Sequence, residues 1–309
     1  MNQQIEKIIG NIEKVIIGKR EAITQAVAAL LTEGHVLVED VPGVGKTQLA
    51  AALAKSVDGS FSRVQMTPDI MPSDITGFSM LNRETGGFDF RQGAAFCNFL
   101  LADEINRASP KSQSALLEVM EEHQVSADGV TYILPRPFMV LATQNPVETY
   151  GTYHLPEAQM DRFAMKISMG YPTAGEEVSI LDRNEYENPI NKISAVLKTD
   201  DIIELQEQVK KIGAAENVKN YIVSIVNATR QDEGIKLGVS PRGSIALYKT
   251  AKAWAFMNGR EYITPQDVKD CCVCTLAHRI MLSPKGKSMY ETAENALESI
   301  MNRTTVPTE

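Results

Sequence analysis

Residues 43–48 have the types and spacing that hold phosphate: Gly43, Val44, Gly45, Lys46, Thr47 and Gln48. Glycines let the backbone fold back, so that consecutive N–H groups point at one anion. A lysine at this place can neutralise the outer phosphates, and the hydroxyl that follows it can ligate Mg²⁺. The segment therefore predicts a nucleotide-phosphate loop. It departs from the usual pattern at one position, where Asp40 stands in place of the first glycine.

The sequences on either side of this loop are those that such a loop requires. Residues 35–38 form a short apolar run, and residues 48–54 read as a helix rich in alanine and leucine. The start of that helix would offer free N–H groups and its positive dipole end to the same anion. An ordinary glycine-rich turn remains the alternative interpretation of the loop taken alone.

Two further apolar runs end in residues that could complete the site. Residues 95–101 are followed by Asp103 and Glu104, and residues 138–143 are followed by Asn145. In a parallel sheet, the carboxyl ends of the strands face one crevice, where ligands of such sheets bind. Hydrolysis of a nucleoside triphosphate requires a cation for the phosphates, an acid and a hydroxyl for Mg²⁺, and groups that orient water. The three strand ends therefore predict a site for ATP, Mg²⁺ and an attacking water.

The alternation of strands and helices predicts the fold that positions these residues. Up to residue 171, the pattern favours an α/β core in which helices cover both faces of a parallel sheet as three layers. Strand signals fade afterwards, and helix starts such as Ser240-Pro241 and Thr264-Pro265 predict a small all-helical domain. We therefore expect a core with N-terminal helices at residues 1–171, a linker at residues 172–195 and a helical lid at residues 196–309.

The two N-terminal helices are separated by an apolar bend that contains Ile17 and Gly18. The bend lies one helix upstream of the phosphate loop, so contact with an adenine ring is one interpretation and simple packing is the other.

Two later segments, Thr67–Asp89 and Gln124–Tyr132, are rich in turn residues. The Asp-Gly pair in the second of them is a strong signal for a β-hairpin.

The composition narrows the class of protein. The chain has 309 residues, of which 43% are hydrophobic and 23% are charged, and its formal net charge is −8. No apolar run in the sequence reaches the ~18 residues of a membrane span, and the N-terminus lacks the basic and apolar segments of a signal peptide. We therefore expect a cytoplasmic protein. The acidic balance disfavours nucleic acid as a partner, because phosphate backbones are bound by clustered lysines and arginines.

Three of the four cysteines, Cys271, Cys272 and Cys274, are close together. Their spacing lacks the paired Cys-x-x-Cys knuckles and the partner histidines of a zinc site. They also fall in a helical segment, where adjacent residues point in different directions. We expect them to be small buried hydrophobic residues.

Four segments carry motifs: FLLADEINRA at residues 99–108, ATQNP at 142–146, LPEAQMDRF at 155–163 and SPR at 240–242. Together they resemble the AAA+ ATPases and, more narrowly, the MoxR family. In that order, they are similar to the family's second nucleotide-binding segment, first sensor, arginine-finger segment and second sensor. The resemblance covers about residues 5–285, and the family tolerates the aspartate in the phosphate loop.

The resemblance implies a role for each matching residue. Lys46 would neutralise charge on the β- and γ-phosphates, and Thr47 and Asp103 would hold Mg²⁺. Glu104 would be the base that polarises the attacking water, and Asn145 would position that water.

Three arginines are implied to act on the nucleotide or on a neighbouring subunit. Arg162 would point at the γ-phosphate bound by the neighbouring subunit, with an ion pair inside its own subunit as the alternative. Arg242 would close onto the nucleotide of its own subunit. A cation at a helix start is disfavoured by the helix dipole, which supports a phosphate partner for it. Arg107 is a further candidate for contact with a neighbour.

The resemblance also implies partners. We expect a homo-oligomeric ring, with a hexamer as the expected size, that remodels, matures or assembles client proteins, often together with a protein that carries a von Willebrand factor A domain. Thr67–Asp89 and Gln124–Tyr132 match insertions that the family directs toward the pore or the client, although plain surface decoration is the alternative. Other hypotheses are a nucleic-acid-stimulated motor, a magnesium-chelatase-like subunit and a nucleotide-gated scaffold that barely turns over.

Overall fold

A five-stranded parallel sheet forms the centre of the core in the computed structural model, which describes residues 2–84, 86–146, 151–184 and 188–307. The central strands are almost wholly buried, as expected for parallel strands with helices on both faces. The parallel α/β core predicted from the sequence is confirmed. In spatial order, the strands are β2 (Phe61–Gln65), β5 (Phe99–Asp103), β8 (Met139–Gln144), β1 (Val36–Glu39) and β9 (Met165–Ile167).

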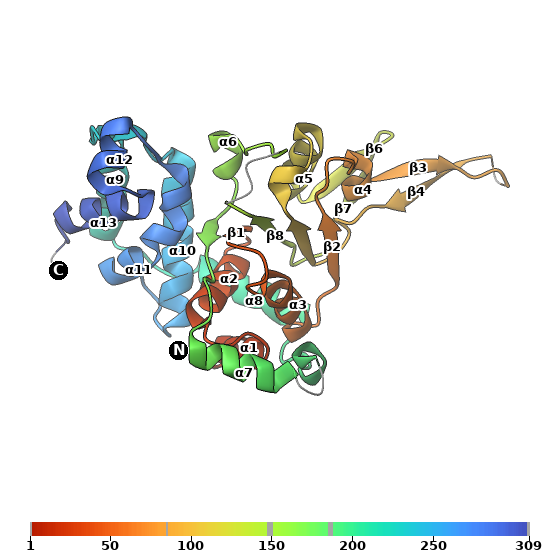
Figure 1. The fold of residues 1–309 in the computed structure, drawn as a ribbon, viewed down its shortest axis with the longest axis horizontal. Coiled ribbons are helices and arrows are strands. Elements are labelled where there is room, and N and C mark those ends of the chain that lie inside the picture. Colours follow the sequence, from red (N-terminus) through yellow and green to blue (C-terminus); the bar gives the residue numbers. More distant parts are fainter. Residues whose placement is uncertain (1, 85, 147–150, 185–187, 308–309) are drawn as a thin grey trace.

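Helices cover both faces of this sheet and give the three layers (Figure 1). On one face, Val38 of β1 belongs to an apolar cluster that includes the N-terminal helices. On the other face, the preceding Leu37 belongs to a second cluster with α5 (Pro110–Glu122). Neighbouring residues of a strand point to opposite faces, which explains the division. The N-terminal helices in the first cluster are α1 (Gln3–Glu13), α2 (Arg20–Leu31) and α3 (Lys46–Ser56), and the cluster continues into helices of the lid.

The register of the sheet brings the ends of several strands together. Glu39 of β1 is opposite Gln144 of β8, and Gln65 of β2 is opposite Asp103 of β5. The carboxyl ends of these strands therefore lie at one edge of the sheet, which we call the carboxyl edge. The opposite end, where His35 precedes β1, is the amino edge.

Two β-hairpins extend from the core. The rings of Phe90 and Tyr132 stack with their centroids 3.9 Å apart and join the two hairpins. The first hairpin projects far from the body of the molecule (Figure 1), and residue 85 near its tip lies outside the described residues. The hairpin predicted at Gln124–Tyr132 is confirmed. The elements are α4 (Pro72–Thr76), β3 (Gly77–Leu81) and β4 (Phe88–Gln92), and then β6 (Gln124–Ala127) and β7 (Val130–Ile133).

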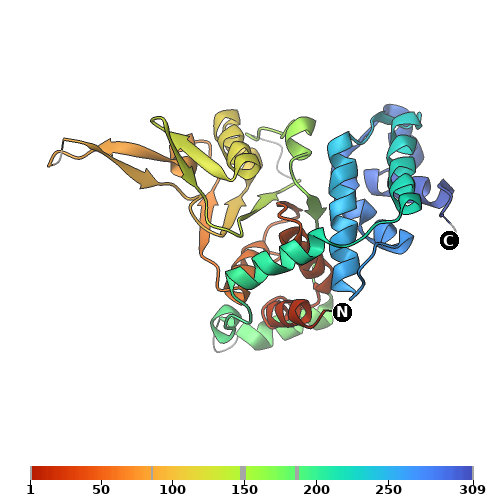
Figure 2. The same cartoon turned by 180° about the vertical axis from the view of Figure 1, so that it is seen from behind.

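A helical lid packs beside the core, on the side away from the β3–β4 hairpin (Figures 1 and 2). The sequence predicts an all-helical lid, and the structure adds one small antiparallel pair, β10 (Ile235–Leu237) with β11 (Met281–Leu282), because the chain before α10 runs beside the chain after η3. The lid helices are α9 (Glu216–Gln231), α10 (Pro241–Met257), α11 (Pro265–Leu276), the 3₁₀ helix η3 (Ala277–Arg279), α12 (Pro284–Tyr290) and α13 (Ala293–Arg303).

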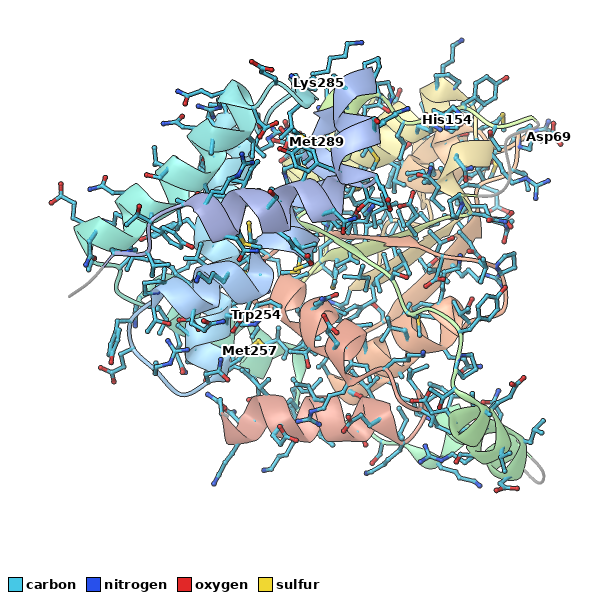
Figure 3. All side chains as sticks on the ribbon, turned by 60° about the vertical axis from the view of Figure 1, so that its left-hand side comes forward. Asp69, His154, Trp254, Met257, Lys285 and Met289 are labelled. Carbon is cyan, nitrogen blue, oxygen red and sulfur yellow. The ribbon has the colours of Figure 1, made fainter. Side chains whose placement is uncertain are left out.

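Core and lid are joined by several contacts. The N–H of Asn2, at the start of α1, donates to the carbonyl of Met257 at 2.7 Å, and Met257 lies at the end of α10 (Figure 3). The helix α8 (Thr199–Lys210) packs against both α2 and α10.

Residues 172–195, predicted as a linker, contain α7 (Ala174–Asn184) and the 3₁₀ helix η2 (Pro189–Lys192). The domain boundaries stay a prediction. Among the described residues, no helix has the length and apolar character needed to cross a membrane.

Candidate nucleotide site

The phosphate loop connects β1 to α3, which begins at Lys46. Gly43 and Gly45 have φ angles of +86° and +99°, a region that residues with a Cβ rarely adopt. A Cβ built on Gly43 would meet no described atom within 4 Å, so the glycine is required by the backbone conformation and not by crowding. The loop therefore forms an open backbone cradle at the start of a helix, where anions bind.

Asp40 has a structural role that explains the departure from the usual glycine. Asp40 is 7% exposed, and its Oδ2 accepts the N–H groups of Met169 at 2.5 Å and Gly170 at 2.8 Å. Its carbonyl accepts the Nζ of Lys46 at 2.7 Å. Asp40 thus connects the phosphate lysine to the segment that follows β9.

A hydroxyl organises the two acids at the end of β5. Thr143 Oγ1 donates to Asp103 Oδ1 at 2.6 Å and accepts the N–H of Glu104 at 2.8 Å. Arg63 of β2 donates from Nη2 to Asp103 Oδ2 at 2.7 Å. Both carboxylate oxygens of Asp103 therefore have partners on neighbouring strands, which fixes the direction of this side chain.

Glu104 has a left-handed backbone, with φ +58°. This conformation is uncommon for a residue with a side chain, and such residues cluster at functional sites. Its Oε2 accepts from Gln65 Nε2 at 2.7 Å and from Arg107 Nη1 at 3.0 Å. Arg107, a candidate for contact with a neighbour, thus has a partner inside its own chain. It lies in the 3₁₀ helix η1 (Ile105–Arg107).

Asn145 follows β8 and is 5% exposed. The carbonyl of Gln144 accepts the N–H of Asp40 at 3.1 Å, and β8 lies between β5 and β1. Asn145 therefore emerges between the acidic strand end at Asp103 and the phosphate loop. The structure brings the three predicted strand ends to one edge, while the chemical roles of their residues stay predictions.

An apolar cavity of about 210 Å³ lies beside the phosphate loop. Ile17 lines this cavity, so the bend predicted to contact adenine is next to it. Gly18, in the same bend, has a φ of +71° and packs against the carboxylate of Glu176 on α7. An apolar wall beside a phosphate cradle fits a nucleotide base. The wall includes Ile16, Ile17, Val44, Gln48, Pro172 and Ile180.

Arg162 and Arg242 lie together at the amino edge of the sheet. Both contact Glu121 near the end of α5: Arg162 Nη1 is 3.5 Å from Oε2, and Arg242 Nη2 is 2.6 Å from Oε1. A cavity of about 220 Å³ beside them is also lined by His35, which precedes β1. The two arginines are therefore at the opposite edge of the sheet from Lys46.

Arg242 is paired with Glu121 in this structure, and its closure onto the nucleotide of its own subunit stays a prediction. Arg242 is in the first turn of α10, as predicted, but the anion that compensates the helix dipole is Glu121. Arg162 forms the ion pair inside its own subunit that was the alternative for it, and also donates from Nη1 to the Leu117 carbonyl at 2.9 Å. The side chains of Arg162 and Arg242 remain 33% and 46% exposed, so both can meet another molecule.

Comparison with known proteins agrees with this arrangement. Residues 35–165 match the ATPase family associated with various cellular activities (AAA), and residues 227–300 match the AAA lid domain. The chain is 39% identical to the chaperone MoxR1 of Mycobacterium tuberculosis (strain ATCC 25618 / H37Rv), over 98% of this chain and 82% of that protein. The chain belongs to the MoxR family of AAA+ ATPases.

Two other proteins are similar to this MoxR-family ATPase over almost the whole chain. YeaC, an uncharacterised protein of Bacillus subtilis (strain 168), is 50% identical over 97% of this chain and 94% of its own length. A crystal structure from Cytophaga hutchinsonii, described as that of a "putative ATPase", has a TM-score of 0.91 and 38% identity, and the match covers 99% of this chain and 95% of that one. The protein is therefore an enzyme that binds and hydrolyses ATP.

Two residues of β2 lie at the site of this MoxR-family ATPase without having been identified from the sequence. Arg63 contacts Asp103, and Gln65 contacts Glu104. The one available signal in the sequence is that Arg63 and Gln65 are two positions apart in the segment FSRVQ, as residues on one face of a strand would be. Only the pairing of β2 with β5 brings these residues to the acids, and strand order is not a local property of the sequence.

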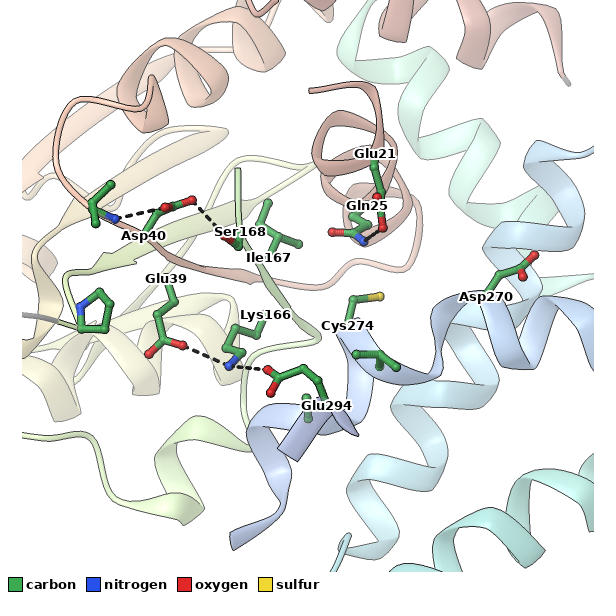
Figure 4. Close-up of a pocket in the computed structure, with 14 residues that line it drawn as sticks. Glu21, Gln25, Glu39, Asp40, Lys166, Ile167, Ser168, Asp270, Cys274 and Glu294 are labelled. Carbon is green, nitrogen blue, oxygen red and sulfur yellow. Dashed lines mark hydrogen bonds and ion pairs between the residues drawn. The ribbon is translucent and has the colours of Figure 1, made fainter. Parts of the chain in front are cut away.

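A larger cavity, of about 510 Å³, separates the carboxyl edge of the ATPase core from the lid (Figure 4). Lys166 of β9 lies in its wall, with Nζ 3.0 Å from Glu39 Oε2 of β1 and 3.0 Å from Glu294 Oε1 of α13. Burial lowers the pKa of Lys166, but the two carboxylates outweigh burial and raise this pKa above its ordinary value. The three residues tie the lid to the strand that leads into the phosphate loop.

The cysteines of the MoxR-family lid are buried in α11, as predicted. Burial raises the pKa of Cys272 and of Cys274 to about 12, and it also raises the pKa of Cys271. All three side chains are therefore protonated thiols near neutral pH, and they pack as small hydrophobic residues.

Proposed function

We propose that this MoxR-family ATPase forms a homo-oligomeric ring, hydrolyses ATP with Mg²⁺ at the interfaces between subunits, and uses this cycle to remodel or assemble client proteins. The observation that carries the proposal is the separation of Arg162 and Arg242 from the crevice of their own chain. The arginines are at the amino edge of the sheet, and Lys46 and Asp103 are at the carboxyl edge. A second copy, docked head to tail, would bring the two half-sites together, and repetition of such a contact closes a ring.

The residues of the carboxyl edge fit ATP and Mg²⁺. The glycine cradle can receive phosphate oxygens, and the Thr47 hydroxyl and the Asp103 carboxylate are the oxygen ligands that Mg²⁺ prefers. Mg²⁺ would neutralise phosphate charge there. The Glu104 carboxylate would accept a proton from the attacking water, and the Asn145 amide would orient that water. The fixed backbone of Glu104 would hold its carboxylate ready for this task.

The arginines of the neighbouring subunit would stabilise the transition state. Charge spreads over the phosphoryl oxygens during transfer, and an arginine supplied by a partner lowers the barrier at that point. In the described chain, Glu121 holds both guanidinium groups. A triphosphate carries more negative charge than one carboxylate, so the γ-phosphate of a neighbour would compete for them.

Subunit mixing tests hydrolysis at interfaces. Arg162→Ala and Glu104→Gln should each lower kcat by roughly a thousandfold. In rings mixed at equal amounts, about one quarter of the sites would combine an intact Glu104 with an intact Arg162 from the neighbour, so activity should return to roughly a quarter of the wild-type value. Failure of two variants that co-assemble to restore activity would refute the interface site.

Two controls accompany the mixing experiment. Arg20→Ala removes another half-exposed arginine that pairs with acids, here Glu6 and Glu13 of the N-terminal region, and should leave kcat unchanged. Chelation of Mg²⁺ should abolish turnover and its return should restore it. Thr47 and Asp103 would hold the ion, and without the ion its positive charge no longer neutralises the phosphates.

The client part of the proposal is supported by the name of the relative, a chaperone, and by apolar side chains on the β3–β4 hairpin. Four of these are between 46% and 73% exposed, and gathered exposed apolar residues mark sites of protein contact. They are Phe78, Met80, Leu81 and Phe88. A protein with a von Willebrand factor A domain is the partner that the family resemblance supports.

Capture experiments test the client. The Glu104→Gln variant with ATP should retain client proteins from cytoplasmic extract, and wild type with ADP should release them. Replacing Phe88 by Ser should reduce this capture without changing the basal ATPase rate. Stimulation of the ATPase by single-stranded DNA, with no ATP-dependent protein capture, would instead favour a nucleic-acid motor.

A further inference from the structure

A buried arginine of the lid holds the backbone on both sides of Arg162. Arg279 in η3 is 6% exposed. It donates from Nε to Asp161 Oδ1 at 2.7 Å and from Nη2 to the carbonyl of Asp161 at 3.2 Å and that of Phe163 at 2.6 Å. Its Nη1 lies 3.3 Å from the carbonyl of Ala164. One guanidinium group therefore contacts the residues immediately before and after Arg162.

The same aspartate also holds the start of the helix that carries Arg242. Ser240 is the N-cap of α10, and its Oγ donates to Asp161 Oδ2 at 2.7 Å while it accepts the N–H of Gly243 at 3.3 Å. The two carboxylate oxygens of Asp161 are thus divided between Arg279 and Ser240.

Gly243 allows this close arrangement. A Cβ at this position would lie 2.4 Å from Val239 Cγ1 and 3.0 Å from Arg279 Cδ. The first turn of α10 therefore rests directly on the side chain of Arg279, and a larger residue would push the turn away.

A role in stability alone explains this cluster poorly. Taking a guanidinium group out of water is costly, and apolar residues of similar volume often stabilise a buried site as well or better. A guanidinium group is planar and donates several hydrogen bonds, so it fixes the positions of its acceptors relative to one another. Here the acceptors are the segment of Arg162 and, through Asp161, the helix start of Arg242.

We propose that Arg279 is a positioning residue that sets the places of Arg162 and Arg242 together, through Asp161 and Ser240. The inference rests on the proposed function, in which these two arginines act on the nucleotide of a neighbouring subunit. Because Arg279 belongs to the lid and Asp161 to the core, a movement of the lid shifts both arginines at once. The position of one subunit's lid thereby controls hydrolysis in the next subunit.

A pair of matched cap variants tests the link without removing the buried charge. Ser240 and Ser283 are both N-caps followed by proline, in α10 and α12, so Ser240→Ala and Ser283→Ala should lose similar stability. Ser240→Ala should also lower kcat by about tenfold, with the Kd for ATP within about twofold, because misplacing catalytic groups by even 1 Å is costly. Ser283→Ala should keep the wild-type kcat. Equal kcat values in the two variants would overturn the proposal.

Subunit mixing provides the second test. Arg279→Lys keeps the charge but loses the guanidinium fork, and it should lower kcat by roughly 10- to 100-fold while ATP binding stays unchanged. Such subunits have an intact nucleotide pocket, so mixing them with Glu104→Gln subunits should restore activity. Arg260→Lys is the control, because Arg260 pairs with Asp267 elsewhere in the lid, and it should retain the wild-type kcat. If Arg279→Lys fails to fold, the comparison of the two cap variants decides alone.

The outcomes separate this inference from the proposed function. Recovery with both Arg162→Ala and Arg279→Lys, each mixed with Glu104→Gln, supports the positioning role. Recovery with Arg162→Ala but not with Arg279→Lys would mean that Arg279 acts only within its own subunit, and the inference fails. Recovery with neither variant, in rings shown to contain both subunits, would overturn the proposed interface site itself.

Discussion

Restoring the usual glycine at position 40 should damage this protein. Asp40→Gly would bring the phosphate loop closer to the common pattern, and a motif alone predicts a neutral or favourable change. The structure predicts the reverse, because the carboxylate of Asp40 accepts the N–H groups of Met169 and Gly170 and also the Ser168 hydroxyl at 3.1 Å.

The magnitude follows from the groups left without an acceptor. Two backbone N–H groups in a largely buried place would each cost about 1–3 kcal/mol, and the added freedom of glycine in the unfolded chain would cost roughly 0.5–1 kcal/mol more. We expect a loss of about 3–5 kcal/mol in the free energy of unfolding. Asp40→Asn keeps one oxygen acceptor and should lose about 1–2 kcal/mol. The Lys46 contact is made to the backbone carbonyl of Asp40, so both variants retain it.

Urea unfolding followed by circular dichroism measures this difference, with midpoint and slope compared among variants. Asp58→Gly is the matched control. Asp58 is exposed and has a φ of +53°, so glycine there relieves backbone strain and should leave the protein as stable or slightly more so. An Asp40→Gly protein with an unchanged midpoint would show that the segment after β9 does not depend on this carboxylate.

Three further predictions concern the base and two ion pairs. Glu104→Gln should abolish ATP hydrolysis while the Kd for ATP, from fluorescent nucleotide titration, stays within about twofold; surviving hydrolysis would mean that Glu104 is not the base. Glu294→Gln should cost at most about 1 kcal/mol at pH 7, because solvent screens this 38% exposed partner of Lys166. Lys166 holds the pKa of Glu294 below its usual 4.5 although burial opposes this. The stabilisation is therefore present above pH 4.5 and lost as the pH falls through the lowered pKa, where the unfolding midpoints of variant and wild type should converge. Asp267→Asn should cost roughly 2 kcal/mol in urea unfolding, because Arg260 loses the charge of a nearly buried partner; an equal midpoint would contradict this.

The sequence predicts the core well because its signals are local. Apolar runs that end at Asp103 and before Asn145, and the glycines around Lys46, each follow from residues close together in the chain. Parallel pairing then brings the strand ends to one edge regardless of their order. The hairpin at Gln124–Tyr132 is equally local, because Asp128 and Gly129 both have positive φ.

What the sequence does not predict depends on distant packing. Gln65 meets Glu104 only because β2 pairs with β5. Arg242 is correctly predicted at a helix start, but the docking of the lid decides which edge of the sheet it reaches. The argument from the helix dipole is sound in requiring an anion, yet it cannot distinguish a phosphate from the carboxylate of Glu121.

The two edges of the sheet are joined by β9, which is only three residues long. Arg162 lies just before this strand at the amino edge, and Met169 lies just after it at the carboxyl edge, where Asp40 holds it. A paired strand of this length spans roughly 10 Å and is stiff. If Asp40 shifted when the phosphate loop bound a ligand, β9 would transmit that shift to the segment that Arg279 holds. In the proposed ring, this short strand would couple the nucleotide state of one subunit to the arginines that the subunit would offer to its neighbour.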